Sequence, residues 1–299
     1  MSESIKEQII KLIKEKKPSL AANTYKTYGS ILSKMFSRLA EENETLQHFL
    51  THQTTKIIEY IQKLPSAQSR KCMLSGMIVL TGNKEYEVPM KTDIKLVNDF
   101  YKQQRVPAKR EKYMVPMSDI IARHEQILQA FKQVQSDKTY QDLILSYLMS
   151  SVLPGLPVRR ITDYALMKVR NYNKDTENCI DKGKFIFNVY KTASKHGREV
   201  IPIPAELKKV INAWLKINKT DYLFVTSGGS PLTVSALSKR VKTLFNGCSV
   251  DTLRSIYVTN KFKNLGSSLA ALEDDASKMG NTLATQLQYY YKKPDTTKE

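Results

Sequence analysis

The sequence predicts a mainly α-helical protein of two domains, the second of which contains a small antiparallel β-sheet. Apolar residues recur at three- and four-residue spacing over most of the 299 residues, which is the pattern of amphipathic helices. Only two runs, 184–190 (K-F-I-F-N-V-Y) and 199–203 (E-V-I-P-I), have the composition of strands. A polar, basic and proline-containing stretch at 102–112 separates the two halves, and the length suits two domains.

The first domain, residues 1–104, is expected to contain only helices. Their apolar stripes are interrupted by Pro18, by Pro65 and by the pair Gly82-Asn83, which mark helix ends. The expected helices are 5–16, a second one capped by Asn23 or Thr24, 54–64, 66–80 and 92–101. Arg70 and Lys71 stand at the start of the fourth helix, where they form either a solvated first turn or a pair of DNA phosphate contacts.

Residues 105–116 are expected to form a basic linker. The stretch K-Q-Q-R-V-P-A-K-R-E-K at 102–112 has little apolar content, so it is interpreted as a flexible tether. Such a tether can also lie along a phosphate backbone, which makes Arg105, Lys109 and Arg110 candidate DNA-binding residues.

The second domain, residues 117–299, is expected to combine helices with one hairpin. The two strand-like runs are joined by K-T-A-S-K-H-G-R (191–198), a polar turn that contains glycine. Trp214, the only tryptophan, lies in an apolar stripe and is interpreted as core. The expected helices are one capped by Ser118 or Asp119 and ending at Phe131, then 140–153, a short one at 159–167, 205–217, 234–245, 251–263, 269–278 and 283–291.

The composition favours a polyanionic partner. Lys and Arg number 47 against 29 Asp and Glu, a formal net charge of +18, and the basic residues are spread along the chain. No apolar run is long enough to cross a bilayer and no signal peptide is visible, so no membrane partner is expected. Cysteines are only three and widely separated, which indicates no disulfide framework, no zinc pattern, and a reducing, intracellular compartment.

Two stretches near the end carry the candidate chemistry. Residues 249–259 (S-V-D-T-L-R-S-I-Y-V-T) predict a helix with an arginine near its start, and 279–293 contains three adjacent tyrosines. A pair of guanidiniums can neutralise a DNA phosphate in place of a metal, a lysine can protonate the leaving oxygen, and a tyrosine can form a covalent phosphotyrosine. The chain has no G-x-x-x-x-G-K-S/T loop, no H-E-x-x-H and no EF-hand loop, so neither a metal nor a nucleotide cofactor is expected.

Four motifs occur in a meaningful order: Arg160 in L-P-V-R-R-I-T-D-Y, Lys191 in the hairpin turn, Arg254 in D-T-L-R-S, and a tyrosine after M-G-N-T. In this order the sequence resembles the tyrosine recombinase (phage-type integrase) family over nearly the whole chain, and the helical amino-terminal region resembles its core-binding (SAM-like) domain. The resemblance implies a C-shaped clamp on double-stranded DNA, a homotetramer on two DNA sites, and a virus or mobile element as source. It implies cutting and rejoining through a 3′-phosphotyrosine, without metal, ATP or a small-molecule substrate.

The resemblance also assigns roles to residues. Arg160, with its R-x-x-D continuation, and Arg254 would hold the phosphate, and Lys191 would be the general acid, with Lys195 as its competitor on the same turn. Tyr290 fits the family spacing as nucleophile better than Tyr289 or Tyr291.

The neighbours of the first arginine receive supporting roles. Asp163 is expected to buttress the site, and Arg159 to be a solvated neighbour or a DNA backbone contact.

Two positions depart from the family. Asp251 replaces the histidine of H-x-L-R, and Asn281 replaces the second histidine or tryptophan; no histidine follows His196. Asn281 can still donate a hydrogen bond to the phosphate, although M-G-N-T is equally a good helix end and cap. Two alternatives stay open. Type IB topoisomerases use the same chemistry, although the helical first domain argues against them, and the departures give weight to a DNA-binding protein with a decayed site.

Overall fold

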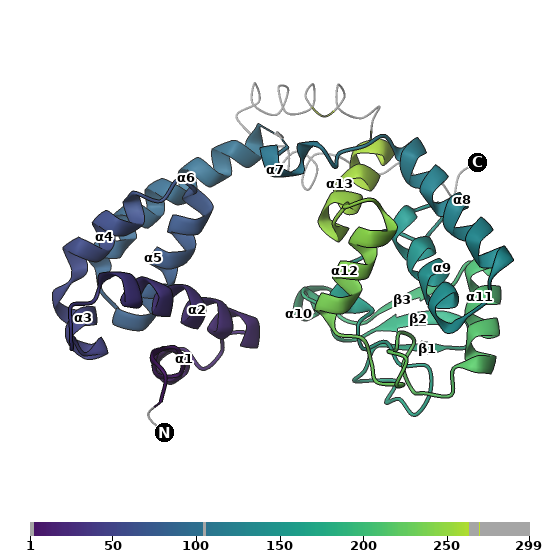
Figure 1. The fold of residues 1–299 in the computed structure, drawn as a ribbon, viewed down its shortest axis with the longest axis horizontal. Coiled ribbons are helices and arrows are strands. Elements are labelled where there is room, and N and C mark those ends of the chain that lie inside the picture. The colour runs from purple at the N-terminus through teal and green to yellow at the C-terminus, as the bar shows by residue number, and fades with distance from the viewer. Residues whose placement is uncertain (1–2, 104–105, 263–268, 270–299) are drawn as a thin grey trace, which may run out of the picture. The chain divides into compact units, whose positions relative to one another are not determined.

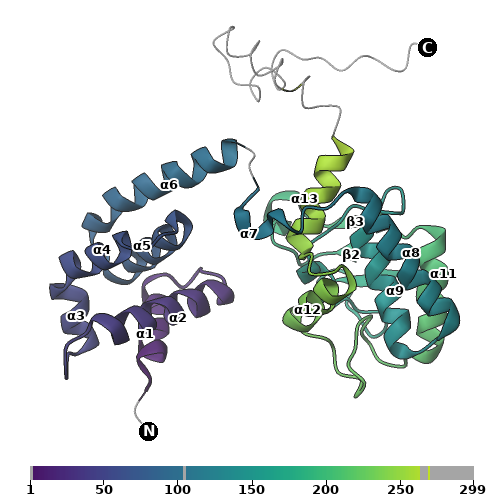
Figure 2. The same cartoon turned by 45° about the horizontal axis from the view of Figure 1, so that its top comes forward.

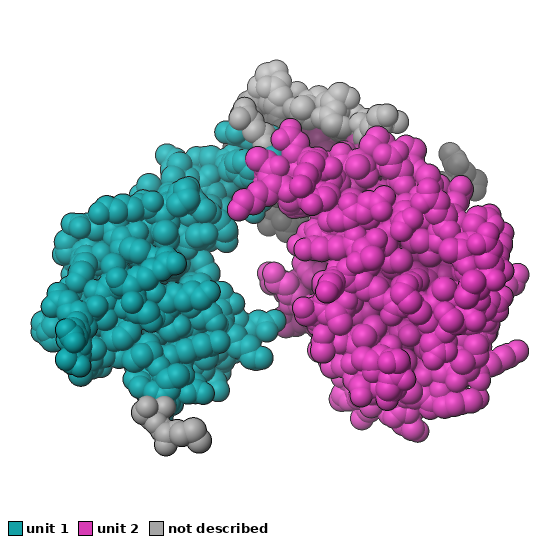
Figure 3. Space-filling model, in the orientation of Figure 1, with its two compact units in different colours: residues 1–106 teal, residues 107–299 magenta. Residues whose placement is uncertain are grey.

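The chain divides into two compact units, residues 1–106 and 107–299 (Figure 3). The computed structural model describes residues 3–103, 106–262 and 269. Each unit has its own hydrophobic core. Among the described residues, no helix combines the length and the apolar content needed to cross a bilayer.

Over its described residues, unit 1 consists of α-helices and one short 3-10 turn (Figure 1). Its central helix is α5, which packs against α1, α2, α4 and α6. From residue 70 to its end none of the residues of α5 is exposed, as expected of a helix that other helices cover on several sides. The elements are α1 (Ile5–Lys16), α2 (Ala22–Leu39), α3 (Leu46–His52), α4 (Thr54–Gln62), α5 (Ala67–Thr81), η1 (Lys84–Tyr86) and α6 (Glu87–Lys102).

The helical prediction for unit 1 is confirmed, with differences at helix ends. Ser66 caps α5, which ends at Gly82 with a φ of 73°. The predicted caps of α2 are wrong, because its N-cap is Ala21 and no side chain caps it. Helix α3 was not predicted, and α6 begins five residues before the helix expected at 92–101. Pro89 lies in the first turn of α6, where the missing N–H costs no hydrogen bond.

Arg70 is a structural residue of unit 1. Its Nε lies 3.0 Å from Oδ1 of Asp93, and its Nη1 donates to the carbonyl of Leu64 at 2.6 Å. The side chain of Asp93 is only 6% exposed and that of Arg70 only 17%. Both roles expected of Arg70, a solvated first turn and a phosphate contact, are therefore wrong. Lys71 is half-buried, and its phosphate contact stays a prediction.

We expect Arg70→Ala to destabilise unit 1 by about 3 kcal/mol, because it leaves the carboxylate of Asp93 buried and unpaired. Lys71→Ala is the matched control and is expected to change stability by less than about 0.5 kcal/mol. Hydrogen exchange of peptides from α5 and α6 measures the effect, with about a hundredfold loss of protection expected for Arg70→Ala. Equal protection in the two variants would contradict this assignment.

Unit 2 is built around α9, whose residues 140–150 are all buried. This helix packs against α8, α11, α12 and α13 (Figures 1 and 2). The elements are α7 (Ala108–Glu111), α8 (Met117–Gln133), α9 (Asp137–Ser150), η2 (Ile161–Asp163), β1 (Cys179–Asp181), β2 (Lys184–Phe187), α10 (Ala193–His196), β3 (Glu199–Pro202), α11 (Ala205–Ile217), α12 (Val234–Leu244) and α13 (Val250–Lys261).

The sheet is antiparallel with the strand order β1-β2-β3. The predicted hairpin is confirmed, since Phe185 of β2 pairs with Ile201 of β3. Strand β1 was missed, although D-K-G precedes β2. Lys182 and Gly183 have φ values of 47° and 76°, which suit a two-residue hairpin turn. Phe185 and Phe187 face the core, where both meet the buried ring of Tyr164.

The other predictions for unit 2 hold in part. Helices α11, α12 and α13 begin and end within two residues of expectation, and Trp214 is core at 1% exposure. The cap of α8 is Pro116 rather than Ser118 or Asp119, and the helix expected at 159–167 is only the turn η2. Residues 270–299, which include the last predicted helix, lie outside the described residues.

The stretch expected to be a flexible tether is in part a packed segment of unit 2. Its residues 108–111 form α7, and the partly buried side chains that follow at 113–115 pack against the core of unit 2. Tyr113 lies close to Gly247, where an added Cβ would be 2.5 Å from its ring. The tether interpretation, which covered residues 102–112, is therefore wrong for residues 108–111.

Candidate catalytic site

Three segments of unit 2 carry the described site candidates: 158–163 with Arg160, 188–198 with Lys191, and 249–254 with Arg254. They come from a 3-10 turn, from the loop between β2 and β3, and from the first turns of α13. The contacts given below join all three segments.

Arg254 is joined to the Arg160 segment. Ser249 caps α13, as expected, by accepting a hydrogen bond from the amide of Thr252 at 3.1 Å. Arg254 lies on the following turn, and its Nε donates to the carbonyl of Val158 at 3.3 Å. Val158 precedes Arg160 by two residues, so this contact joins the side chain of Arg254 to the segment that carries Arg160.

Asp251 lies at the solvent edge of this site. Its Oδ1 is 3.8 Å from Nη1 of Arg254, and its side chain is 77% exposed. Water screens a pair of this length and exposure, so it holds Arg254 only weakly. The backbone carbonyl of Asp251 accepts a hydrogen bond from Nη2 of Arg110 at 2.9 Å, and the same nitrogen donates to Ser255 Oγ at 2.9 Å. Arg110 thus binds α13 and is not part of a free tether, while its phosphate contact stays a prediction.

The two adjacent arginines have different surroundings. Arg159 is 12% exposed, donates from Nε to Asp163 Oδ2 at 3.0 Å, and pairs through Nη1 with Glu199. Its guanidinium also lies 4.1 Å from the ring centroid of Phe187. The expectation of a solvated Arg159 is therefore wrong, and a guanidinium held by two carboxylates is poorly placed to bind a phosphate. Asp163 is 2% exposed and buttresses Arg159.

Arg160 is half-buried and is the N-cap residue of η2. Among the described residues, its side chain has neither an ion pair nor a hydrogen bond. Of the two adjacent guanidiniums, only that of Arg159 has ion-pair partners among the described residues.

We expect Arg159→Ala and Arg160→Ala to separate stability from activity. Arg159→Ala leaves Asp163 as a buried, unpaired carboxylate and should cost about 3–5 kcal/mol of stability. Arg160→Ala breaks no described pair and should cost less than about 0.5 kcal/mol, while the DNA chemistry proposed below is lost. Urea unfolding followed by the fluorescence of Trp214, which reports on unit 2, measures the difference. Equal destabilisation by the two changes would contradict these roles.

The loop between β2 and β3 exposes both lysine candidates. Lys191 lies on a turn and Lys195 in the short helix α10, and both are exposed. Tyr190 Oη donates to the carbonyl of Gly197 at 2.6 Å and so joins the two ends of this loop. Burial raises the pKa of Glu199, but the hydrogen bond and charge of Arg159 outweigh burial, so the pKa lies below its ordinary value.

Asn178 is a residue that the sequence analysis missed. Its buried amide contacts the backbone of Asp163 and of Val189, which belong to the Arg160 turn and to the Lys191 loop. Asn178 directly precedes β1, a strand that was not predicted, so no pattern in the sequence pointed to its contacts.

The remaining candidates have simple placements. Lys109 is exposed on α7, and its phosphate contact stays a prediction. Arg105, Asn281 and the tyrosines 289–291, with the expected nucleophile Tyr290, lie outside the described residues. Within the described part of the chain, no group of three or more His, Cys, Asp and Glu side chains is arranged to hold a metal ion. Cys72, Cys179 and Cys248 are free thiols.

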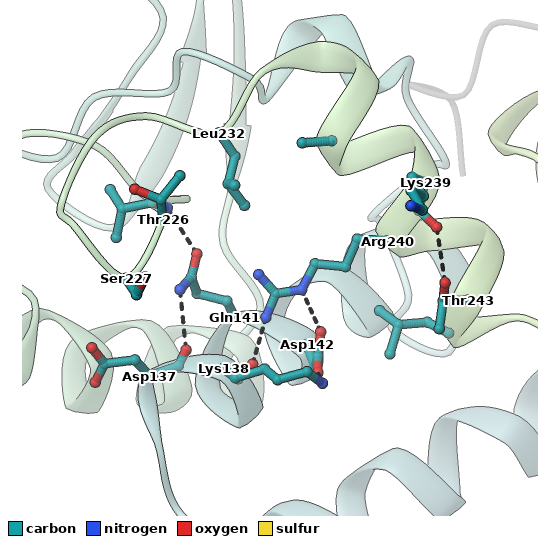
Figure 4. Close-up of a pocket in the computed structure, with 13 residues that line it drawn as sticks. Asp137, Lys138, Gln141, Asp142, Thr226, Ser227, Leu232, Lys239, Arg240 and Thr243 are labelled. Carbon is teal, nitrogen blue, oxygen red and sulfur yellow. Dashed lines mark hydrogen bonds and ion pairs between the residues drawn. The ribbon is translucent and has the colours of Figure 1, made fainter.

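A pocket of about 620 Å³ lies between α9, the turn at 225–232 and α12, and it contains none of the site candidates (Figure 4). Its polar groups are largely satisfied by protein partners. Gln141 accepts from the amide of Val225 at 2.8 Å, and Arg240 donates to Asp142 and to the carbonyl of Lys138. These contacts hold α9, the turn and α12 together, so the groups serve the fold.

The comparisons with known proteins give structural neighbours only. No family model matches the chain, and no curated protein matches it. A crystal structure of XerA recombinase is 11% identical, with 97% of this chain and 94% of that chain covered and a TM-score of 0.36. A lambda integrase(75–356) dimer bound to a COC′ core site is 15% identical, with coverages of 89% and 92% and a TM-score of 0.49. A lambda integrase tetramer bound to a Holliday junction is 13% identical, with coverages of 88% and 72% and a TM-score of 0.48. Because these identities and TM-scores are low, the neighbours do not indicate the function of this chain.

Proposed function

We propose that the chain is a site-specific DNA recombinase or integrase that cuts and rejoins double-stranded DNA through a covalent 3′-phosphotyrosine. The observation that carries the proposal is the junction of the three cationic segments. Arg254 contacts the backbone at Val158, and Asn178 joins the turn of Arg160 to the loop of Lys191. The segments that carry three cationic side chains are thus joined, and three cations that converge on one phosphodiester would neutralise its charge.

Each residue of the proposed site has one task. Arg160 and Arg254 bind the non-bridging oxygens and stabilise the charge that builds up on phosphorus substituents during attack. Tyr290 loses its hydroxyl proton to solvent as its oxygen forms the new bond to phosphorus, and the bond from phosphorus to the 5′-oxygen breaks. Lys191 gives that oxygen a proton, so a 5′-hydroxyl leaves. Attack by a 5′-hydroxyl on the phosphotyrosine reverses the sequence and returns the tyrosine, so neither ATP nor a metal is consumed or required.

The partner is a DNA duplex, as the +18 net charge favours. Exchange of strands between two duplexes needs four phosphates cut in pairs, so the proposal includes a homotetramer on two DNA sites. The helical unit 1 supports a recombinase over a type IB topoisomerase, whose amino-terminal domain is expected to be rich in β-structure.

A DNA-binding protein with a decayed site is the second candidate, and Asp251 is the observation that favours it. The carboxylate lies 3.8 Å from Arg254 on the exposed side of the site, where it opposes an incoming phosphate. Such a protein would bind duplex DNA but form no covalent product.

The experiment that decides between the candidates is adduct trapping on nicked duplexes that lose a short strand on cleavage. A library of random duplex sequences supplies the site, and the protein–DNA adduct is isolated under denaturing conditions. An adduct that forms in excess EDTA and releases a tyrosine-linked nucleotide supports the recombinase. Cleavage that requires added magnesium contradicts the proposed mechanism, and binding without any adduct supports the decayed site.

A further inference from the structure

We propose that Asn178 is a positioning residue that holds the loop of Lys191 against the turn of Arg160. The proposal rests on the recombinase function proposed above, because it concerns the delivery of a proton to the leaving oxygen. Asn178 lies immediately before β1, is 9% exposed, and belongs to neither of the two segments that it joins.

The amide of Asn178 uses both of its ends. Its Oδ1 accepts hydrogen bonds from the backbone amides of Asn188 and Val189, each at 2.8 Å. Its Nδ2 donates to the carbonyl of Val189 at 2.7 Å and to the carbonyl of Asp163 at 3.0 Å. Two donors and one acceptor are required at this place, and asparagine is the side chain of this size that supplies them.

The contacts lie at the point where the chain leaves β2. Val189 is two residues from Lys191, and Asp163 ends the turn that Arg160 begins. At the other end of the loop, Arg159 pairs with Asp163 and with Glu199, the first residue of β3. The guanidinium of Arg159 also lies 5.0 Å from the ring centroid of Tyr190, next to Lys191. The loop is therefore fixed to the Arg160 turn at both ends, although its lysines are exposed.

The consequence for the chemistry is geometric. A general acid acts only when its proton lies within hydrogen-bond reach of the leaving oxygen, and a displacement of about 1 Å can cost about a hundredfold in rate. Asn178→Ala removes all four hydrogen bonds and so loosens the β2 end of the loop from the Arg160 turn. Asn178→Asp keeps the two bonds from the amides but cannot donate to the two carbonyls. Both variants leave Arg160, Lys191 and Arg254 in place.

The test replaces the bridging 5′-oxygen of the scissile phosphate by sulfur. A thiol has a pKa of about 8.5, far below that of an alcohol, so a thiolate leaves without a general acid. On the ordinary nicked duplex, we expect Asn178→Ala to slow single-turnover adduct formation by about a hundredfold, and Asn178→Asp by less. On the sulfur-bridged duplex, both should recover to within about tenfold of the wild type. Lys191→Ala or Lys195→Ala, whichever removes the acid, should show the same recovery, and Arg254→Ala should not.

Asn218→Ala is the matched control. Asn218 is also buried, and it also binds backbone groups on both sides of its amide, at Thr220 and Tyr222. None of its hydrogen bonds reaches the segments of Arg160, Lys191 or Arg254, so its loss should cost stability alone and leave the two substrates alike. Hydrogen exchange of peptides from β2 and duplex affinity at one salt concentration check that the Asn178 variants are folded.

The possible results distinguish a failure of the role proposed for Asn178 from a failure of the proposed recombinase function. If the wild type forms adducts, the inference is overturned by a normal rate for Asn178→Ala on the ordinary duplex. It is equally overturned by a loss of the same size on both duplexes. If the wild type forms no adduct on either duplex, the recombinase function itself fails and takes the inference with it.

Discussion

Tyr290→Phe is expected to bind duplex DNA like the wild type and to form no covalent adduct. Phenylalanine lacks the oxygen that would attack phosphorus, while the basic groups that bind DNA remain. The measurement is adduct formation on the nicked duplex beside affinity at one fixed salt concentration. The expected loss is complete within detection, because no other step of the proposed reaction replaces a missing nucleophile.

Two neighbouring tyrosines provide matched controls. Tyr289→Phe and Tyr291→Phe make the same chemical change one residue away, and both are expected to retain the adduct. An adduct that survives in Tyr290→Phe and disappears in one of the controls would move the nucleophile by one position and leave the mechanism intact. Survival of the adduct in all three variants would contradict a tyrosine nucleophile within this trio.

The fold was predictable where its determinants are local. Helix α11 was predicted with both ends correct, and the β2–β3 hairpin was found from a short apolar run and a glycine-containing turn. The errors occur where tertiary contacts decide. Strand β1 has three residues and little apolar pattern of its own, and it exists because β2 pairs with it. The segment at 159–167 has a helical pattern but forms only one 3-10 turn, which is held by the buried Asp163.

The sequence predicts candidate site residues but not their contacts. The order of Arg160, Lys191 and Arg254 gives the candidate cationic groups, and the structure shows that the segments carrying them are joined. No pattern in the sequence distinguishes a free arginine from a paired one, so Arg70, Arg110 and Arg159 were all assigned to DNA. Two of their partners, Asp93 and Glu199, lie 23 and 40 residues away in sequence, whereas Asp163, the other partner of Arg159, lies in the same motif. Spacing within one motif carries no information on the distant contacts.

Arg254→Ala is expected to reduce adduct formation by about a thousandfold while most of the duplex affinity remains. The guanidinium stabilises charge that builds up on the phosphate in the transition state, and loss of one such donor typically costs about 10²–10³ in rate. The hydrogen bond from Nε to the carbonyl of Val158 orients the guanidinium of Arg254. The side chain is 34% exposed, so its other two nitrogens can reach an added phosphate. Single-turnover cleavage on the nicked duplex measures this loss.

Lys261→Ala supplies the control, because it removes one positive charge from the exposed far end of the same helix. It should leave the cleavage rate unchanged and reduce only the salt dependence of binding. A loss of cleavage in Lys261→Ala as large as that in Arg254→Ala would mean that the charge of the whole helix, rather than one placed guanidinium, matters.

Asp251→His in the same assay tests the most unusual position of the site. Unit charges about 4 Å apart interact by about 4 kcal/mol at an effective dielectric of 20, but the high exposure of Asp251 screens most of that energy. Removing the carboxylate should therefore leave cleavage equal or up to about tenfold faster, with the fold unchanged, because Arg110 binds the backbone of residue 251 and not its side chain. Abolition of cleavage by Asp251→His would instead give the aspartate a positive role in holding Arg254.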